Sequence, residues 1–545
     1  MRTTLSISTG LLFVATAVAC TGASPPPPIL TVTSPARGLV QSEAGQLTVT
    51  GSAMPGTDGH RVAKVIVNHV AATLRPDGSF TATLDAPNGA MLLETVATSD
   101  NGGSASDTRA VQTGQLRPVG AAIDRAITVA LSADGFARLS AAAGPIMKTM
   151  DISALLAPLQ PMVSAGDDLV NLKLAVTGLK FTDSKIALAP AGGGLSFSAE
   201  LDGLEVAATV DYAGALVPDG STNVTVVANQ VTITGTLDVT PAGASGFTTR
   251  LVAPAVHTVG LRLNATGGVG DVLSLLNNVL GSTMETVVTR SAELALEPLV
   301  NQALGALAGP QQVDVLGNKL HLQASPSAIT LTPAGALVAM NLTAMIEGSE
   351  ASPGYIFTNN GVPAMDVSHG FQLGLADDLV NELLAEIHAL GVLDLRVQQD
   401  FGPFDAAQFK LTMPPMISAN TGDGAMRLVI GDMLVTFSQH GAPVVKAAIN
   451  AQVDLKIAPA ANAREVALQL GAVDLRINLL DDAAGTAGVS DDDLFSATSD
   501  GIALQLDSLS QLLITVPVPS VAGIQLEHLS IGADSGYVVM AGQIH

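Results

Sequence analysis

The sequence predicts an α+β protein in which two similar halves of antiparallel sheet each wrap helices and follow a small all-β sandwich. The main observation is a repeated opening. The stretch 126–136 alternates apolar residues with small or polar ones, and 370–380 repeats this pattern 244 positions later. In both copies the alternation, which is typical of a strand, changes to the 3.6-residue spacing of an amphipathic helix. The chain therefore begins the same kind of domain twice.

A second correspondence closes both copies. The stretch 329–340 matches 529–540 without a gap at a constant offset of 200, so the second copy is shorter by 44 residues. Alternating stretches joined by Pro and Gly turns fill the middle of each copy and predict further antiparallel strands. In the first copy we also expect a long helix from Asp271 to Leu307, with breaks or kinks at Gly281 and Pro298.

The N-terminus has the features of a secretory signal. A lightly charged start is followed by the apolar stretch 11–19, which is too short to span a membrane. The Ala-Val-Ala that precedes Cys20 resembles a bacterial lipobox, in which the cysteine is acylated and becomes the mature N-terminus. We therefore expect a lipoprotein signal peptide at 1–19 and a lipidated Cys20 at the head of a stiff Pro-rich spacer, 20–28. An ordinary signal with a free cysteine nearby is the alternative.

Residues 29–113 are predicted to form the small sandwich. Short alternating stretches are separated by turn signals such as Pro55-Gly56 and Asp77-Gly78, at the interval expected of an antiparallel sandwich. The segment resembles bacterial Ig-like modules, which usually act as spacers or adhesive units. We expect a spacer, because no residue pattern in this segment carries catalytic chemistry.

Composition narrows the range of partners. With 24 basic and 48 acidic residues the net charge is −24, which argues against nucleic acid, because phosphate-rich partners are held by basic patches. The mean hydropathy of +0.43 is high. The longest uncharged runs are broken by Pro and Gly and alternate like strands, so we expect no membrane-spanning helix. The apolar content has two open explanations: simple richness in Ala and Val, or an interior lined for an apolar guest.

The motifs of common enzymes are missing from the sequence. It contains no Gly-x-Ser-x-Gly elbow, no His-Glu-x-x-His and no phosphate-binding loop with Lys. A single cysteine excludes a multi-cysteine metal site. The acidic runs 481–482 and 491–493 could offer oxygen ligands to calcium, although a solvated acidic loop fits them better. We therefore expect a protein that is not an enzyme, with no catalytic residue, metal or cofactor.

Three stretches carry a resemblance to a known family. Residues 375–393 are similar to the strand-to-helix opening of that family's second barrel, 127–137 to its first opening, and 176–186 to an early strand pair of its first barrel. Over residues 114–545 the chain thus resembles the bactericidal/permeability-increasing protein family, the tubular lipid-binding (TULIP) proteins. The family's first-barrel disulfide cannot form here, since Cys20 is the only cysteine.

The resemblance implies two elongated antiparallel β-barrels, 114–348 and 366–545, joined by a linker at 349–365. Each barrel would wrap a long helix and have a seam that admits acyl chains. The candidate lipid-groove residues are the apolar positions after the two openings: Phe136, Leu139 and Ile146 in the first half, and Val380, Leu383 and Ile387 in the second.

The expected function is that of a lipid-binding or lipid-transfer lipoprotein, anchored in the outer membrane and facing the periplasm or the cell surface. Its partners would be a lipid or other apolar ligand and, through Cys20, the membrane. Thr21, in place of an Asp, resembles an outer-membrane sorting signal. The alternative is a surface adhesion or scaffold protein that acts through the module at 29–113.

Overall fold

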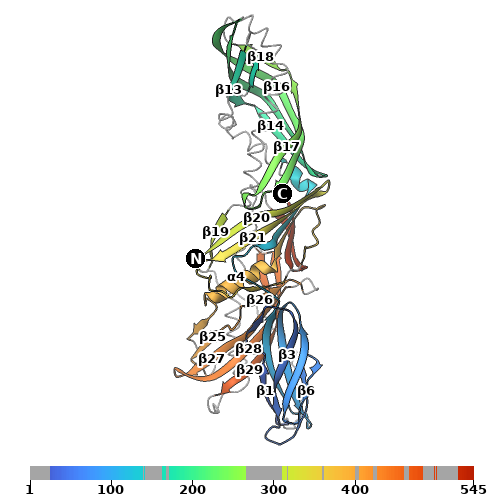
Figure 1. Cartoon of the computed structure of the whole chain (residues 1–545), viewed down its shortest axis with the longest axis vertical. Helices are drawn as coiled ribbons and strands as arrows, with labels where there is room; N and C mark the ends of the chain where they lie inside the picture. The colour runs from blue at the N-terminus through green and yellow to red at the C-terminus, as the bar shows by residue number, and fades with distance from the viewer. Residues whose placement is uncertain are drawn as a thin grey trace. The chain divides into compact units, whose positions relative to one another are not determined.

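Figure 1 shows a computed structural model of the chain. The structure describes residues 25–138, 140–141, 163–166, 171–215, 217–265, 310–315, 317–358, 361–398, 404–420, 426–459, 466–482, 496, 499 and 526–544. Its described residues divide into two compact units. The first contains 25–36, 46–84 and 93–108, and the second contains 37–45, 85–92 and the chain from 109 onward.

Every regular element described between residues 25 and 113 is a strand. A four-stranded sheet has the order β1-β3-β7-β6, and a five-stranded sheet has the order β2-β9-β8-β4-β5. In this part of the chain the side chains of Phe80 and Leu93 are among the most deeply buried. The strand bounds are β1 Ile29–Ser34, β2 Leu39–Gln41, β3 Gly45–Met54, β4 Val62–Val67, β5 Val70–Ala71, β6 Thr73–Leu74, β7 Ser79–Ala86, β8 Gly89–Ser99 and β9 Ser104–Thr113.

A seven-stranded antiparallel sheet combines strands from both predicted halves. Its order is β19-β20-β21-β11-β23-β31-β30, and we refer to it as the shared sheet. The bounds are β11 Ile123–Ser132, β19 Pro310–Val315, β20 Asn318–Thr332, β21 Gly335–Ile346, β23 Phe371–Ala376, β30 Leu526–Asp534 and β31 Tyr537–Ile544. A separate two-stranded sheet pairs β10 (Gln115–Arg117) with β22 (Tyr355–Phe357).

The two predicted opening strands are neighbours at the centre of the shared sheet. β11 and β23 pair antiparallel, with Val129 opposite Leu373 and Ile127 opposite Leu375. Val129 and Leu373 are also the equivalent residues of the repeat, 244 positions apart. A local two-fold axis therefore passes between them, and each copy supplies one side of the same sheet.

The two closing strands flank this pair. β21 lies beside β11 and places Val338 opposite Val129, whereas β31 lies beside β23 and places Met540 opposite Leu373. Val338 and Met540 are thus equivalent, which is an offset of 202 and not the predicted 200. A shift of two residues keeps every side chain on the same face of a strand. The sequence match therefore had the correct face but the wrong register.

Each half also has a sheet of its own, which we call an end sheet. The first has the order β12-β13-β15-β16-β17, with β14 on β15 and β18 on β16; the second has the order β24-β25-β27-β28-β29, with β26 on β27. The bounds of the first are β12 Val163–Gly166, β13 Asn171–Lys180, β14 Asp183–Ala191, β15 Gly194–Gly214, β16 Val217–Pro241, β17 Phe247–Val259 and β18 Arg262–Ala265. Those of the second are β24 Leu395–Val397, β25 Ala406–Lys410, β26 Met416–Ser418, β27 Met426–Gln439, β28 Ala442–Pro459 and β29 Val466–Asp482.

The predicted fold class, α+β with two barrels each wrapping a long helix, is wrong. Strand accounts for 69% and helix for 7% of the described structure, so its class is close to all-β. The described helical residues are α4 (Asp377–Ala389), the 3-10 turn η2 (Gly243–Ser245), a short segment at 133–141 in which residue 139 is left out, and the single positions 496 and 499. The helix predicted over 271–307 lies outside the described residues.

None of the described sheets closes into a barrel. The physical reason lies in the shared sheet. The opening and closing strands of the two copies hydrogen-bond to one another, β21 to β11, β11 to β23 and β23 to β31. Their backbone groups are therefore not available to close a separate barrel in each half.

Candidate functional site

The predicted groove residues of the first half fall largely outside the described chain. Phe136 is half-buried and packs against the apolar cluster of the first end sheet. Leu139 and Ile146 lie outside the described residues. Their assignment to a lipid groove stays a prediction.

The first end sheet has a long aliphatic face. Along β15 every second side chain is apolar and buried from Leu195 to Leu201 and again from Leu204 to Val210, and β16 continues this face through pairs such as Val206 with Val226. The buried apolar side chains of β15 run from Leu195 to Val210, so at about 3.3 Å per residue the face is roughly 50 Å long. Two of the nineteen buried members are aromatic, Phe197 and Phe247. The face is therefore mostly aliphatic, buried and without charge.

The predicted groove residues of the second half lie together on α4. Ile387 is fully buried, and Val380 and Leu383 are half-buried against the cluster that joins α4 to the second end sheet. The stacked rings of Phe404 and Phe437, 4.6 Å apart, belong to the same cluster. In this structure these three side chains of α4 contact the protein's own core, and their contact with lipid stays a prediction.

A second face of α4 carries buried carboxylates that the sequence analysis did not identify. Asp377, Asp378, Glu382 and Glu386 are each at most 3% exposed. The last three follow one another at four-residue spacing and so share one side of the helix. We call these four residues the α4 carboxylates. Their i, i+4, i+8 pattern is visible in the sequence, but acidic residues at this spacing ordinarily mark the solvent side of an amphipathic helix.

Each of the α4 carboxylates holds a different segment of backbone. The amide N–H of Ala419 donates to Asp377 Oδ2 at 2.8 Å, and that of Thr358 donates to Asp378 Oδ1 at 2.8 Å. The N–H of Gly120 donates to Glu382 Oε1 at 2.7 Å.

Glu386 Oε2 accepts from the N–H of Ile346 and, at 2.6 Å, from the hydroxyl of Ser349. The remaining oxygens of two of these side chains, Glu382 Oε2 and Glu386 Oε1, are buried and have no hydrogen-bond partner among the described residues. The acidic side of α4 therefore fastens loops and strand ends from both halves to one helix.

Burial shifts the protonation of these groups. It raises the pKa of Asp377 from 3.8 to about 7, against the opposing bond from Ala419. It raises the pKa of Glu382 from 4.5 to about 8, and the neighbouring Glu386 adds to this effect. The pKa of Glu386 is also raised by burial. In each case burial removes hydration from the charged form of the carboxyl group. This destabilises the charged form by more than the hydrogen bonds that the group accepts stabilise it.

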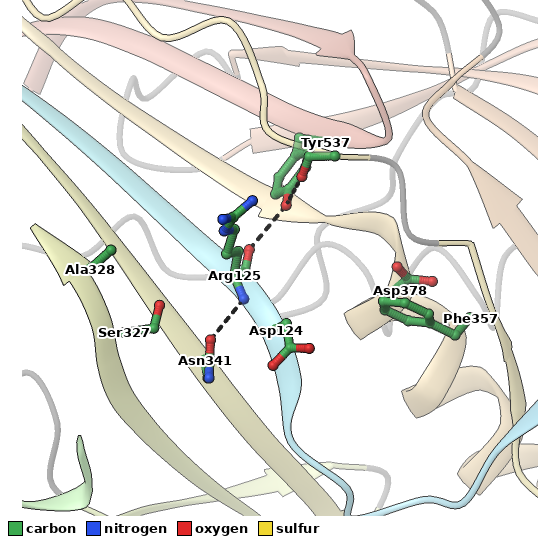
Figure 2. A pocket seen from close by; sticks show the side chains of 9 residues that line it. Asp124, Arg125, Ser327, Ala328, Asn341, Phe357, Asp378 and Tyr537 are labelled. Carbon is green, nitrogen blue, oxygen red and sulfur yellow. Dashed lines mark hydrogen bonds between the residues drawn. The ribbon is translucent and has the colours of Figure 1, made fainter. Parts of the chain in front are cut away.

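A polar cavity of about 340 Å³ opens beside the centre of the shared sheet (Figure 2). Its lining comes from β11, β20, β21, β22, α4 and β31, and from the segment after β22: Asp124, Arg125, Ser327, Ala328, Asn341, Phe357, Gly361, Asp378 and Tyr537. The N–H of Arg125 donates to Asn341 Oδ1 at 2.9 Å. The Tyr537 hydroxyl is shared between the carbonyl oxygens of Arg125 at 3.2 Å and Gly361 at 2.9 Å.

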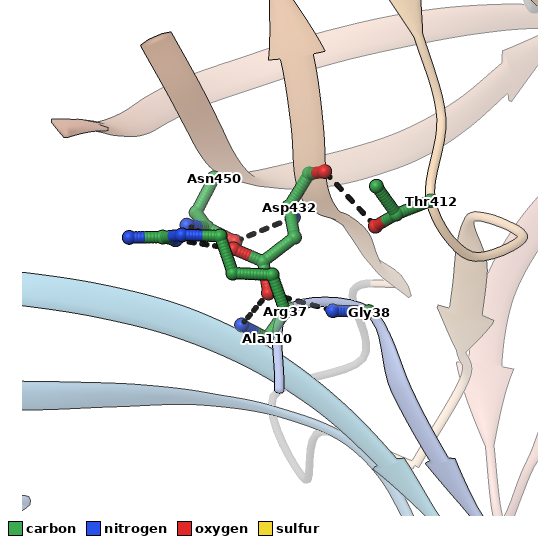
Figure 3. A network of polar contacts seen from close by, with 6 residues as sticks. All are labelled: Arg37, Gly38, Ala110, Thr412, Asp432 and Asn450. Atoms are coloured by element: carbon green, nitrogen blue, oxygen red, sulfur yellow. Dashed lines mark hydrogen bonds and ion pairs between the residues drawn. The ribbon is translucent and has the colours of Figure 1, made fainter. Parts of the chain in front are cut away.

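A third polar network surrounds Asp432 and is structural (Figure 3). The carboxylate of Asp432, which is fully buried, pairs with Arg37 at 2.6 Å. It also accepts from the N–H of Gly38 at 3.0 Å and of Ala110 at 2.9 Å. The amide of Asn450 bonds both the N–H and the carboxylate of Asp432. Because both oxygens already have close donors, this carboxylate is a fastening point within the second unit and not a ligand site.

The network also joins part of the predicted module at 29–113 to the rest of the second unit, which matters for any deletion of that module. Arg37, Gly38 and Ala110 belong to that predicted module, yet they contact Asp432 within one compact unit. Deleting 29–113 would therefore leave a buried carboxylate without its cation and two backbone donors.

The described residues contain neither a cluster of metal-binding side chains nor a membrane-spanning helix. No group of three or more His, Cys, Asp or Glu side chains in the described parts of the chain is arranged to hold a metal ion. No described helix is both long and apolar enough to cross a membrane. The acidic runs proposed as possible calcium ligands lie mainly outside these residues, and that hypothesis is not tested.

Comparison with known proteins gives weak structural similarities. No protein-family model and no curated protein sequence matches the chain. The crystal structure of a lipopolysaccharide binding protein is similar with a TM-score of 0.39 and 14% identity, covering 78% of this chain and 99% of that one. The crystal structure of P47 of Clostridium botulinum E1 is similar with a TM-score of 0.28 and 9% identity, covering 78% and 100%. Values this low assign neither fold nor function to this chain.

We predict that Arg37→Ala destabilises the protein by about 3 kcal/mol, because it leaves the buried carboxylate of Asp432 without its cation. Chemical denaturation followed by circular dichroism measures the change. Lys185→Ala, which removes one partner of the exposed Lys185–Glu200 pair, is the control and should change stability little. Equal effects of the two substitutions would contradict the structural role of Asp432.

We also predict that the free energy of unfolding falls as pH rises from 5 to 9. Asp377 and Glu382 keep their protons in the folded chain up to about pH 7 and 8. The unfolded chain releases them near pH 4, so the folded state binds more protons across this window and loses stability with rising pH.

Glu382→Gln keeps the acceptor for Gly120 but cannot ionise. Relative to the parent, we expect a gain on the order of 2 kcal/mol at pH 9 and little change at pH 5. Thermal unfolding over this pH range measures it, with the exposed Glu205→Gln as the control. A parallel pH dependence of the parent and the Glu382→Gln variant would refute the assignment.

Proposed function

We propose that this chain binds lipid and is a relative of the tubular lipid-binding proteins. The observation that carries the proposal is the aliphatic face of the first end sheet, which is roughly 50 Å long at strand spacing and contains no buried charge along β15 and β16. The aliphatic side chains of this face are complementary in chemistry to acyl chains.

The energy needed for binding is available without any polar motif. Burying a methylene contributes about 0.8 kcal/mol, so a long acyl chain can gain on the order of 10 kcal/mol before the costs of association. Nearly all of the cluster consists of Ala, Val, Leu and Ile. The scarcity of aromatic side chains favours a flexible hydrocarbon ligand over a sugar or a flat ring.

The doubled architecture gives further support. Each half contributes an end sheet and its opening and closing strands to the shared sheet. The sequence resemblance to tubular lipid-binding proteins rests on the same opening stretches, so both lines of argument point to one class of protein.

The proposal includes an anchor in the outer membrane through Cys20. The lipobox-like residues before the cysteine and the Pro-rich spacer after it support this part of the proposal. Expression of the full chain in a Gram-negative host with a radiolabelled fatty acid should label the protein. Cys20→Ser should abolish the label and release the protein from the membrane fraction. Labelling that persists in the Cys20→Ser variant would refute the anchor.

Lipid binding is tested on the chain purified without residues 1–19 and with Cys20→Ser. We expect native mass spectrometry to detect bound lipid, and a fluorescent fatty acid to be taken up with saturation. Absence of both results would overturn the proposal.

A matched pair of substitutions tests the face itself. Ala208 points into the aliphatic face and Ala207, its neighbour, points to the other side of β15. Ala208→Trp should lower fatty-acid uptake at least about 10-fold, since its ring fills space that the acyl chain needs. Ala207→Trp should leave uptake unchanged. Loss of stability in the Ala208→Trp variant without loss of uptake would show that this position is core and not part of the binding face.

A further inference from the structure

The cavity beside the centre of the shared sheet is formed around an unusual turn of backbone. Arg125 has a φ of 53°, in the left-handed region that residues other than glycine rarely adopt. The pairing of β11 with β21 shifts register between Ile123 and Ile127, so Arg125 lies in a β-bulge. Bulges and left-handed residues recur where a strand redirects a side chain toward a site.

Two side chains hold this strained backbone in place. Asn341 Oδ1 accepts from the N–H of Arg125, and the Tyr537 hydroxyl donates to its carbonyl oxygen. Asn341 comes from β21 and Tyr537 from β31, so strands from both halves support the bulge. These two hydrogen bonds fix the backbone of the bulge from both halves. They involve only the backbone of Arg125 and not its guanidinium group.

Asp124 and Arg125 bring opposite charges into one cavity without neutralising each other. Both residues are exposed. In the described chain no ion pair joins either side chain to a partner. Figure 2 shows the reason: at the bulge the two side chains leave β11 in different directions. The cavity therefore presents a separate positive and negative group.

The other polar groups of the lining are mostly engaged. Asp378 accepts two bonds from Thr358, and the hydroxyl of Ser327 donates to the carbonyl of Ala339. The ring of Phe357 has the guanidinium of Arg117 over it, 3.4 Å from its centroid. The groups that remain for a ligand are the guanidinium of Arg125, the carboxylate of Asp124 and the amide nitrogen of Asn341.

We propose that this cavity binds a zwitterionic phosphodiester of the phosphoethanolamine kind. The phosphate accepts from the guanidinium of Arg125, and the ammonium lies against the carboxylate of Asp124. A phosphate dianion would be repelled by Asp124, and a simple cation would be repelled by Arg125. A volume of about 340 Å³ lies within the range of small-molecule pockets and exceeds the needs of a single ion.

Such a group could belong to a phospholipid headgroup or to a soluble phosphodiester. Only the first source rests on the proposed lipid-binding function. The soluble compound glycerophosphoethanolamine tests the cavity alone, because it carries no acyl chain.

The first experiment titrates the chain lacking residues 1–19 and carrying Cys20→Ser with glycerophosphoethanolamine, inorganic phosphate and ethanolamine, using isothermal titration calorimetry at low salt. We expect saturable binding of the zwitterion, and binding of either single ion at least about 10-fold weaker, since each ion leaves one charged group without a partner. No binding of glycerophosphoethanolamine at millimolar concentration, or equal binding of phosphate alone, would overturn the proposal.

The second experiment uses Arg125→Gly. Glycine adopts a left-handed φ without strain, so this variant should be at least as stable as the parent while binding of the zwitterion falls about 10-fold or more. Asp124→Asn should also weaken binding, by a smaller factor because the amide oxygen still accepts from the ammonium. Arg250→Ala, which removes an exposed guanidinium on β17, should change nothing. Unaltered binding in the Arg125→Gly variant would refute the site.

A third experiment, with lipid vesicles, distinguishes a phospholipid headgroup from a soluble phosphodiester and tests the cavity separately from the proposed function. Vesicles containing phosphatidylethanolamine should deliver lipid to the parent faster than to the Arg125→Gly variant, whereas uptake of a fatty acid should be equal in both. Binding of glycerophosphoethanolamine together with no uptake of any lipid would support the cavity, assign it to a soluble phosphodiester, and overturn the proposed function alone.

Discussion

The antiparallel pairing of β11 with β23 is the interaction on which the second unit depends. It places the opening strands of the two copies side by side, with Val129 opposite Leu373 at the local two-fold axis. The backbone bonds that join the copies also commit the strands that could otherwise close each half. The result is a shared sheet with one end sheet for each half, and a chain with two similar halves that cannot be separated without breaking a sheet.

The buried carboxylates of α4 solve a problem that this arrangement creates. Loops and strand ends from several segments arrive next to one helix, and their N–H groups need acceptors. Asp377, Asp378, Glu382 and Glu386 supply them. The cost is that ionisation of these groups is disfavoured, which is why the pKa of Glu382 rises to about 8. Structural order in the centre of the chain is thereby coupled to pH near neutrality.

The aliphatic face and the polar cavity are complementary in chemistry. One is aliphatic, uncharged and long enough for acyl chains, and the other presents Arg125 and Asp124 as separate charges at a strained bulge. A phospholipid carries both kinds of group. The two proposals nevertheless rest on different residues, so an experiment on Ala208 and one on Arg125 can succeed or fail independently.

By itself the sequence determined the repeat, the strand character of both openings and the position of α4, because these depend on local periodicity. Alternation at 127–131 and 371–375 predicts strands wherever they pair. The sequence could not show that these two strands pair with each other. It also could not show that the equivalent of Met540 is two residues from the predicted position, because contacts between distant segments determine strand pairing and register. For the same reason the apolar side of α4 was predicted, while nothing local marks its acidic side as buried. Only the tertiary structure brings the N–H groups of Gly120, Ile346 and Thr358 to those carboxylates. It also brings together the residues that line the cavity around Arg125. In both cases the groups belong to segments far apart in the chain, and no local sequence pattern determines which distant segments will pack together.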